Sequence, residues 1–331
     1  MAVNHDSTGA ILRTLADGHF HSGEQLAQLL GVSRSAVWKH VQQLAEFQLE
    51  VFRVPGKGYR LAAPLELLDA EKIRAALSAQ HRLRLQTLEI LHSVDSTNDW
   101  LGVRTELAPA ACLAEAQTAG RGRRGRHWVS PFGANLYLSF AWQFDELPPG
   151  FTALGMVAAI AAVRALQQLG ITGAAVKWPN DLIAGDCKLG GILVDVQGES
   201  PNRLRAVIGI GLNVQMPEAA SENIDQAWTD LATLMGGVAP SRNALVAALL
   251  DELFTALDVF SAQGFAAFGD DWRALDRIAG REVVLQQHER RITGTALGVD
   301  QDGALLLRSG DGTRRFVSGD ISLRLHDAFN N

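Results

Sequence analysis

The segment 120–126 constrains the fold of this chain more than any other stretch. Its seven residues are four arginines and three glycines. Glycine lets the backbone approach a ligand closely, and arginine carries a planar charged fork that matches phosphate and carboxylate oxygens. The segment follows a predicted strand at 112–117 and satisfies G-x-G-x-x-G. A dinucleotide-binding fold also needs a helix directly afterwards, which Pro131 and Gly133 disfavour. We therefore predict an anion-binding loop outside a Rossmann fold, with an exposed basic loop that contacts nucleic acid as the alternative.

Length and composition indicate a soluble protein of two or three domains. The chain has 331 residues, of which 47% are hydrophobic and 20% charged. Its net charge of -6 excludes a general attraction to nucleic acid, so DNA binding would need a local surface. Two cysteines, Cys112 and Cys187, provide no disulfide framework and fit a reducing cytoplasm. The apolar stretch 151–163 is too short to cross a bilayer, so we expect no membrane partner. The N-terminal residues include Asp6 and no long apolar run, so we expect no signal peptide.

The N-terminal segment predicts a helix-turn-helix. A short helix is expected at 7–16. Ser22 and Gln25 then form a capping box, and the helix that they open ends at Gly31. Ser33 caps a second helix, so that two short helices are joined through a glycine-containing turn.

Two apolar-alternating strands around a Pro-Gly turn follow at 51–54 and 59–61, and they complete a winged helix-turn-helix domain at 1–64. In such a domain the second helix enters the major groove, and the wing, with Arg60, contacts phosphates. Because the segment has six Lys/Arg against five Asp/Glu, a helical interaction module without DNA remains the alternative. The residues predicted to contact DNA are Ser22, Ser33, Arg34, Ser35, Trp38, Lys39 and Lys57.

Residues 65–277 predict an α+β domain with a mixed sheet. Polar residues at 95–99 should cap a helix that begins near Trp100 and leave N–H groups and hydroxyls facing a pocket, although an ordinary cap is also possible. Lys188 precedes paired glycines on the second strand of a hairpin. This spacing suits an ammonium held over a site, or a surface lysine near a turn. Gly209 and Gly211 lie inside a predicted strand and indicate a bulge or a close approach.

Five short strands punctuated by glycine predict a small β-barrel at 278–331. The strands are expected at 282–285, 292–296, 304–307, 313–317 and 321–325.

Four motifs occur in order along the chain, at 115–126, 177–181, 188–193 and 209–213. Together they resemble the motif set of biotin–protein ligases. With the N-terminal winged helix, the chain resembles the bifunctional bacterial form, the biotin–acetyl-CoA-carboxylase ligase that also represses the biotin operon. The resemblance covers nearly the whole chain and implies a multidomain α+β protein with an SH3-like C-terminal barrel.

The resemblance implies a two-step reaction. The biotin carboxylate attacks the α-phosphate of ATP to give biotinyl-5′-AMP and pyrophosphate, with Mg²⁺ and positive groups offsetting the charge. The ε-amine of a lysine on the biotin carrier domain of acetyl-CoA carboxylase then attacks the mixed anhydride. Biotin operator DNA and a homodimer of the adenylate-bound protein are the other implied partners. A regulator that binds biotin without transferring it, and a lipoate ligase, are the alternatives.

The resemblance also implies the site residues. Ser96, Thr97, Asn98 and Gln117 would contact biotin, and Arg121, Gly122 and Arg123 would clasp the ligand and its phosphate. Lys188 would lie between the biotin carboxylate and the α-phosphate, and Asp181 would receive a proton from, or position, the acceptor amine. Lys177 would assist catalysis, Gly191 would adjoin the ligand, Asn213 would lie near the nucleotide, and Trp128 would stack on adenine or belong to the core. No protein ligand for a metal is expected.

Overall fold

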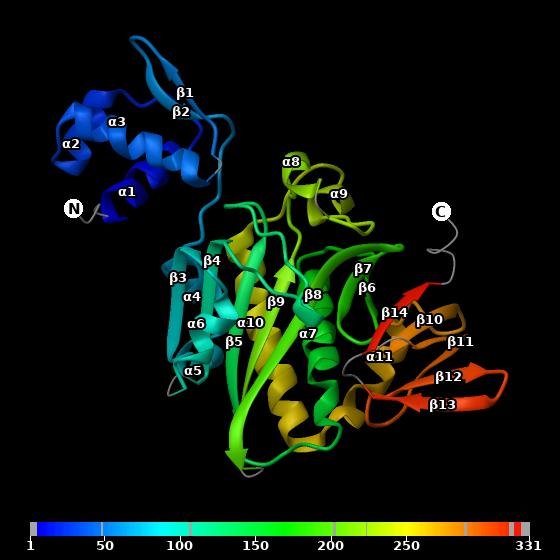
Figure 1. Ribbon diagram of the computed structural model, residues 1–331. Helices are drawn as coiled ribbons and strands as arrows, with labels where there is room; N and C mark the ends of the chain where they lie inside the picture. The colour runs from blue at the N-terminus through cyan, green and yellow to red at the C-terminus, as the bar shows by residue number, and fades with distance from the viewer. Residues whose placement is uncertain are drawn as a thin grey trace.

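The structure is a computed structural model that describes residues 5–47, 49–105, 108–200, 203–222, 224–287, 290–317 and 321–325. Figure 1 shows three successive parts. A small N-terminal helical unit in blue carries a hairpin, a large central α+β domain follows, and a β-rich C-terminal unit in orange and red lies at the opposite side. The expected multidomain α+β architecture is confirmed.

The N-terminal unit is a winged helix-turn-helix. Its helices are α1 (His5–Leu15), α2 (Gly23–Leu30) and α3 (Arg34–Gln43), and its hairpin pairs β1 (Val51–Val54) with β2 (Gly58–Leu61). The capping box is present: Ser22 Oγ accepts from Gln25 N at 3.1 Å, and Gln25 Oε1 accepts from Ser22 N at 2.8 Å. Gly31 has φ 62° and ends α2, because glycine adopts this left-handed conformation without strain.

The central domain is built on a seven-stranded mixed sheet with the order β3-β4-β5-β9-β8-β7-β6. The β3–β4 pair is parallel and the other paired neighbours are antiparallel. The strands are β3 (Thr87–Val94), β4 (Ala110–Gln117), β5 (Leu136–Phe144), β6 (Ala174–Lys177), β7 (Asp181–Ala184), β8 (Cys187–Ser200) and β9 (Arg203–Leu212).

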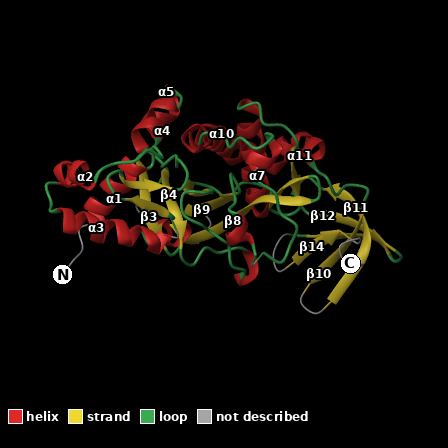
Figure 2. Ribbon diagram, turned by 90° about the horizontal axis from the view of Figure 1, so that it is seen from above, coloured by secondary structure: helices red, strands yellow, loops and turns green. Residues whose placement is uncertain are grey.

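The main helices pack on one face of this sheet and leave the other face for the site. Figure 2 shows α4, α10 and α7 along one side of the strands. The expectation that the apolar stretch at 151–163 is too short to cross a membrane is wrong, because the helical segment Phe151–Gln168 is long and apolar enough to do so. In this structure α7 is instead buried against α10 and the sheet as a core helix. The helices of the domain are α4 (Ala70–Ala76), α5 (Ala79–Arg84), α6 (Thr97–Gly102), α7 (Leu154–Gln168), α8 (Glu218–Ser221), α9 (Leu231–Leu234), α10 (Arg242–Gln263) and α11 (Gly269–Leu275).

A buried ion pair fixes the chain between the N-terminal unit and the sheet. Arg242 Nη2 lies 2.6 Å from Glu115 Oε2, and these side chains are 4% and 2% exposed. Glu115 Oε1 also accepts from Leu68 N at 2.6 Å, so both carboxylate oxygens are bonded. A buried pair is tolerated only when its polar atoms are satisfied in this way. The N-terminal unit makes a further contact through Phe47, whose ring centroid lies 4.7 Å from that of Phe132.

The C-terminal unit is a five-stranded antiparallel sheet with the order β13-β12-β11-β10-β14. Trp178, which is fully buried, donates from Nε1 to the Gly303 carbonyl at 3.1 Å and so ties this unit to the central domain. Closure of the sheet into an SH3-like barrel stays a prediction. The strands are β10 (Glu282–Gln287), β11 (Arg290–Val299), β12 (Leu305–Ser309), β13 (Gly312–Phe316) and β14 (Ile321–Leu325).

Candidate functional site

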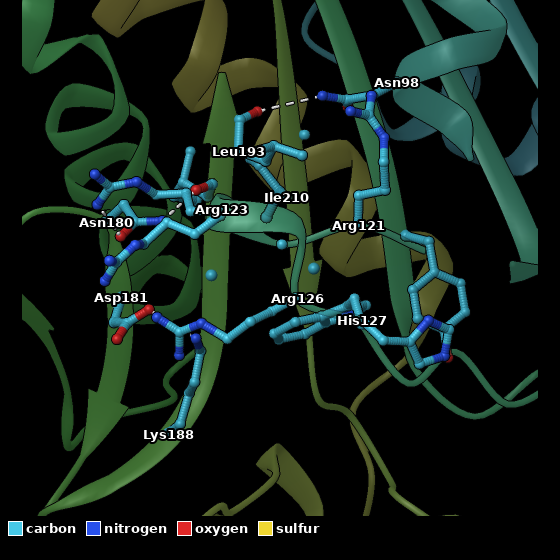
Figure 3. Close-up of a pocket in the computed structure, with 18 of the residues that line it drawn as sticks. Asn98, Arg121, Arg123, Arg126, His127, Asn180, Asp181, Lys188, Leu193 and Ile210 are labelled. Atoms are coloured by element: carbon cyan, nitrogen blue, oxygen red, sulfur yellow. Dashed lines mark hydrogen bonds and ion pairs between the residues drawn. The ribbon is translucent and has the colours of Figure 1, made fainter. Parts of the chain in front are cut away.

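A polar cavity lies on the open face of the central sheet, between the start of α6, the loop at 120–126 (the arginine loop) and the strands β6 to β9 (Figure 3). Four segments that are far apart in the sequence meet here. The cavity is lined by these residues from the sequence analysis: Ser96, Thr97, Asn98, Gln117, Arg121, Gly122, Arg123, Trp128, Lys177, Asp181, Lys188 and Gly191.

One end of the cavity consists of uncharged polar groups at the start of α6. The helix begins at Thr97, earlier than the expected start near Trp100, because Ser96 caps it by accepting from Asp99 N. Thr97 N donates to Gln117 Oε1 at 2.9 Å. Ser96 and Thr97 are buried, so this end offers fixed hydrogen-bonding groups in a partly dehydrated setting.

Asn98 adds an amide whose orientation is set by its neighbours. Its Nδ2 donates to Asp195 Oδ2 at 3.0 Å and to the Leu193 carbonyl at 3.4 Å, while its Oδ1 accepts from the Ser139 hydroxyl. The amide packs directly on β9, since a Cβ at Gly209 would lie 2.4 Å from Asn98 Oδ1. The expected close approach at Gly209 is confirmed.

The arginine loop is a compact turn that crosses the cavity mouth. Gly122 N donates to Arg126 O at 2.7 Å, and Trp128 N donates to Gly120 O at 2.8 Å. No α-helix follows the motif before β5, so the Rossmann interpretation is excluded for this described part of the chain. Arg124 has φ 61°, an uncommon value for a residue with a side chain.

The first two arginines of the loop reach opposite sides of the cavity, as Figure 3 shows. The Arg121 guanidinium bonds the Asp99 carboxylate and lies 3.1 Å from Asp195 Oδ2. Arg123 Nη1 donates to Asn180 Oδ1 at 3.1 Å. The loop is therefore braced between α6 and β8 on one side and the β6–β7 turn on the other.

The charged end of the cavity is a carboxylate between two lysines. Lys188 Nζ lies 2.8 Å from Asp181 Oδ1, and Lys177 Nζ lies 3.4 Å from Asp181 Oδ2. Burial would raise the pKa of Asp181, but the charges of Lys188 and then Lys177 outweigh it and hold this pKa below the ordinary 3.8. Two ammonium groups beside one carboxylate leave net positive charge where an anionic ligand would enter.

Trp128 forms part of the cavity rather than of the main core. Its ring centroid lies 5.5 Å from Lys188 Nζ, and a Cβ at Gly211 would lie 2.5 Å from the ring. Gly211 is thus the second confirmed close approach on β9. The indole Nε1 is buried without a hydrogen-bond partner among the described residues, which leaves a donor available at the ligand site.

Asn213 is the one expected ligand residue outside the cavity lining. It is 3% exposed, its Nδ2 donates to the Thr229 carbonyl at 3.0 Å, and its Oδ1 is buried without a partner in the described chain. The sequence analysis gave no role to several other residues that line the cavity, including Asn180, Arg126, His127 and Gln226. Arg126 and Asn180 lie within the motifs at 115–126 and 177–181. Gln226 lies in none of the four motifs and lines the cavity from a separate loop.

A second candidate surface lies on the N-terminal unit. Ser33, Arg34, Ser35, Trp38 and Lys39 are exposed at the start of α3, and the Trp38 side chain is 44% exposed. On the wing, Lys57 is exposed, and both Lys57 and Arg60 lie over the Phe20 ring, at 5.8 and 5.1 Å from its centroid. The Ser22 hydroxyl accepts a hydrogen bond from Gln25 N and so caps α2. Exposed basic and hydrogen-bonding side chains on the second helix of a helix-turn-helix, which here is α3, are typical of a surface that contacts DNA bases.

These features define a class of protein: a DNA-binding module joined to an enzyme whose cavity combines a fixed polar end with a cationic end. Comparisons with known proteins agree. Residues 90–213 match the biotin/lipoate A/B protein ligase family, residues 9–60 match an HTH domain, and residues 278–324 match the biotin protein ligase C terminal domain. The chain is 42% identical to the bifunctional ligase/repressor BirA of Escherichia coli K12, over 95% of this chain and 96% of that protein.

The chain belongs to the biotin/lipoate A/B protein ligase family. It is also 30% identical to the bifunctional ligase/repressor BirA of Bacillus subtilis, over 93% of this chain and 95% of that protein. Among solved structures, the biotin protein ligase from Aquifex aeolicus in complex with biotin and ATP aligns with TM-score 0.62 and 29% identity. That alignment covers 72% of this chain and 98% of the other.

Proposed function

We propose that this protein is an ATP-dependent biotin–protein ligase that also represses transcription. The observation that carries the enzymatic half is the meeting of the arginine loop, the Asn98–Gln117 polar end and the Lys188–Asp181–Lys177 cluster in one cavity. Two relatives that match over 95% and 93% of this chain are named bifunctional ligase/repressors, and a similar structure holds biotin and ATP together. These names favour biotin over lipoate and a catalyst over a purely biotin-sensing regulator.

In the first step a biotin carboxylate oxygen forms a bond to the α-phosphorus of ATP, and pyrophosphate leaves. Both reactants are anionic, so the site must offset their repulsion. We assign this role to Lys188 and Lys177, whose ammonium groups flank Asp181, with Arg123 closing over the phosphates. The fixed groups of Ser96, Thr97, Asn98 and Gln117 suit the ureido ring of biotin because they present both donors and acceptors.

In the second step the nitrogen of the acceptor lysine bonds to the carbonyl carbon of the mixed anhydride, and the bond from this carbon to the phosphate oxygen breaks. AMP leaves, and its phosphate takes up the proton that the amine loses. The attacking amine must be neutral. Of the two roles considered for Asp181, positioning the amine is favoured, because a carboxylate whose pKa is lowered by two lysines is a weak proton acceptor. The carrier domain of acetyl-CoA carboxylase is the acceptor that we propose.

Magnesium is expected as the companion of ATP. The described residues contain no group of three or more His, Cys, Asp or Glu side chains placed to hold a metal ion. Asp181 is the carboxylate that lines the cavity in the described chain, and two lysines already bond it. In our proposal the ion would arrive on the phosphates of the nucleotide, as is usual for Mg²⁺.

For the regulatory half, we propose that α3 and the wing bind biotin operator DNA when the adenylate is bound. Helix-turn-helix proteins usually read two half-sites as dimers. The adenylate would order the arginine loop and complete a surface for homodimerisation, so that operator binding follows the supply of biotin. We place the protein in the cytoplasm, where ATP, DNA and carboxylase are available.

A labelling experiment tests both halves. Purified protein is incubated with biotin, ATP and Mg²⁺ and a biotin carrier domain, and operator DNA is added to a parallel sample for a mobility shift. We expect one lysine of the carrier to be labelled only when biotin and ATP are both present, and a DNA shift that strengthens under the same conditions. An unlabelled carrier with a normal DNA shift would instead identify a regulator without ligase activity.

A further inference from the structure

The C-terminal end of α6 is held by two side chains that are not among the described residues lining the ligand cavity. Arg205 on β9 donates from Nη2 to the Leu101 carbonyl at 3.0 Å and to the Arg104 carbonyl at 3.1 Å. Gln197 on β8 donates from Nε2 to the Gly102 carbonyl at 2.8 Å. Carbonyl groups at and just beyond the end of this helix are therefore bonded from two strands of the sheet.

The two strand side chains are also bonded to each other. Arg205 Nη1 donates to Gln197 Oε1 at 2.8 Å, which orients the amide so that its nitrogen faces the Gly102 carbonyl. The reversed amide would set its oxygen against that carbonyl and its nitrogen against a guanidinium, and neither pair can form a hydrogen bond. Arg205 is 6% exposed, so these bonds form in a partly dehydrated setting. A positive charge is also favourable at the C-terminus of a helix.

The helix depends on tertiary contacts, because its six residues are too few to form a stable helix alone. Its first two residues, Thr97 and Asn98, line the polar end of the cavity. At a rise of about 1.5 Å per residue, the two ends of α6 are about 9 Å apart. Arg205 therefore holds the far end of the element that carries these cavity residues. A misplacement of about 1 Å at a ligand-binding group can cost about 100-fold in activity.

Apolar packing holds α6 on the sheet but does not set its direction. The Leu101 side chain is fully buried, in a cluster with Cys112, Ala141 and Val207. Hydrophobic contacts of this kind are non-directional. Hydrogen bonds from a charged donor add geometric specificity. The bonds from β8 and β9 therefore supply the orientation that the packing leaves open.

We propose that Arg205 is a positioning residue for ligand binding: together with Gln197 it fixes the direction of α6 and so the places of Thr97 and Asn98 in the cavity. The inference rests on the proposed ligase function, in which biotin binds at this polar end. Arg205 lies away from the groups that would react, so its loss should weaken biotin binding and leave the chemical step nearly unchanged.

Two variants and one control test the anchoring of α6 in the ligand-free, full-length protein. Arg205→Met removes the donors and keeps a long side chain, whereas Arg205→Lys keeps the charge and one donor group. Arg164→Met is the matched control, because the same substitution breaks a pair between α7 and α11, Arg164 Nη2 to Asp271 Oδ2 at 2.7 Å. Hydrogen exchange is followed by mass spectrometry. We expect exchange in α6 to accelerate about tenfold to a hundredfold in Arg205→Met and less in Arg205→Lys, with α10 unchanged.

Biotin calorimetry and steady-state kinetics then test the positioning role. Arg205→Met should raise both Kd and KM for biotin by about tenfold or more, because the ligand-binding groups on α6 are displaced. KM for ATP and kcat should stay within about twofold of the wild type. Arg205→Lys should fall between Arg205→Met and the wild type, and Arg164→Met should match the wild type.

Unchanged exchange in α6 of a folded Arg205→Met variant would overturn the anchoring. Faster exchange throughout the chain with a lower Tm, or faster exchange in α6 with unchanged biotin affinity, would overturn the positioning role, since Arg205 would then only stabilise the fold. A failure of the ligase function would appear in the wild type itself, as no biotin bound or no adenylate formed. A failure of the present inference appears only in the variants, so the two are distinguished.

Discussion

Lys188→Met removes the ammonium that the proposed chemistry needs most while it keeps a side chain of similar length. Lys188 Nζ lies 2.8 Å from Asp181 Oδ1, and its side chain is 17% exposed, so its charge acts in a partly dehydrated cavity. Loss of one such contact to developing charge typically lowers kcat by about 100-fold to 1000-fold, or roughly 2.7–4 kcal/mol. The polar end of the cavity, which we propose binds biotin, is untouched, so biotin should still bind with an affinity close to that of the wild type.

The assay is biotin-dependent pyrophosphate release under single-turnover conditions, with biotin binding measured separately by calorimetry. Lys72→Met, the same change at an exposed lysine on α4, is the matched control and should leave both quantities unchanged. A thermal melt shows whether the variant is folded, because the change leaves Asp181 with Lys177 as its remaining lysine partner. A folded variant that releases pyrophosphate within about threefold of the wild-type rate would refute the role of Lys188.

Four further predictions concern separate parts of the molecule. Arg123→Gly should leave adenylate formation measurable but release the adenylate about tenfold to a hundredfold faster, seen as biotin labelling of an unrelated lysine-rich protein. Gly209→Ala should raise KM for biotin by about tenfold, measured by steady-state kinetics, because the new Cβ would lie 2.4 Å from Asn98 Oδ1. Arg34→Ala should weaken operator binding by about fivefold to 150-fold in a mobility shift and leave carrier labelling unchanged. For Asp181, a lowered native pKa means stability that is present above the ordinary 3.8 and lost as pH falls through the native value. The wild-type Tm should therefore fall more steeply below about pH 4 than that of Asp181→Asn.

Local sequence signals predicted the N-terminal unit well. Ser22, Gln25 and Gly31 define their helix ends through contacts within a few residues, so the helix boundaries are readable without the rest of the chain. The hairpin at the wing is similarly local. The strand glycines Gly209 and Gly211 predicted close approaches correctly, although the sequence did not reveal that the approaching groups are Asn98 and Trp128.

The start of α6 shows where local reasoning was incomplete. Several residues in the run 95–99 are good N-caps, and the sequence alone placed the helix start near Trp100. The structure selects Ser96 as the cap, since Thr97 is then positioned for its N–H to reach Gln117, twenty residues later in the chain. The hydrogen bond from Thr97 to Gln117 is a tertiary contact, so it could not help to choose among the candidate N-caps of α6 from the sequence alone.

The long-range contacts of the site were beyond the sequence. In the sequence, Asp195 is only a polar residue on a predicted strand. Its carboxylate accepts hydrogen bonds from Asn98 and Arg121, which precede it by 97 and 74 residues, and these contacts could not be predicted. Asn180 lies inside a recognised motif, yet its bond to Arg123 depends on how the arginine loop folds over the strands. Asn213 donates from Nδ2 to the Thr229 carbonyl, a contact that the sequence did not indicate. Its expected place near the nucleotide stays a prediction.

The central claim is that this cavity joins biotin to AMP, and biotin-dependent exchange of labelled pyrophosphate into ATP tests it most directly. The exchange needs neither the carrier protein nor DNA, because reversal of the first step alone returns label to ATP. We predict exchange that requires biotin, is not supported by lipoate, and falls by about 100-fold or more in Lys188→Met. Biotin that binds to the folded protein without promoting any exchange, or exchange that proceeds equally without biotin, would contradict the account.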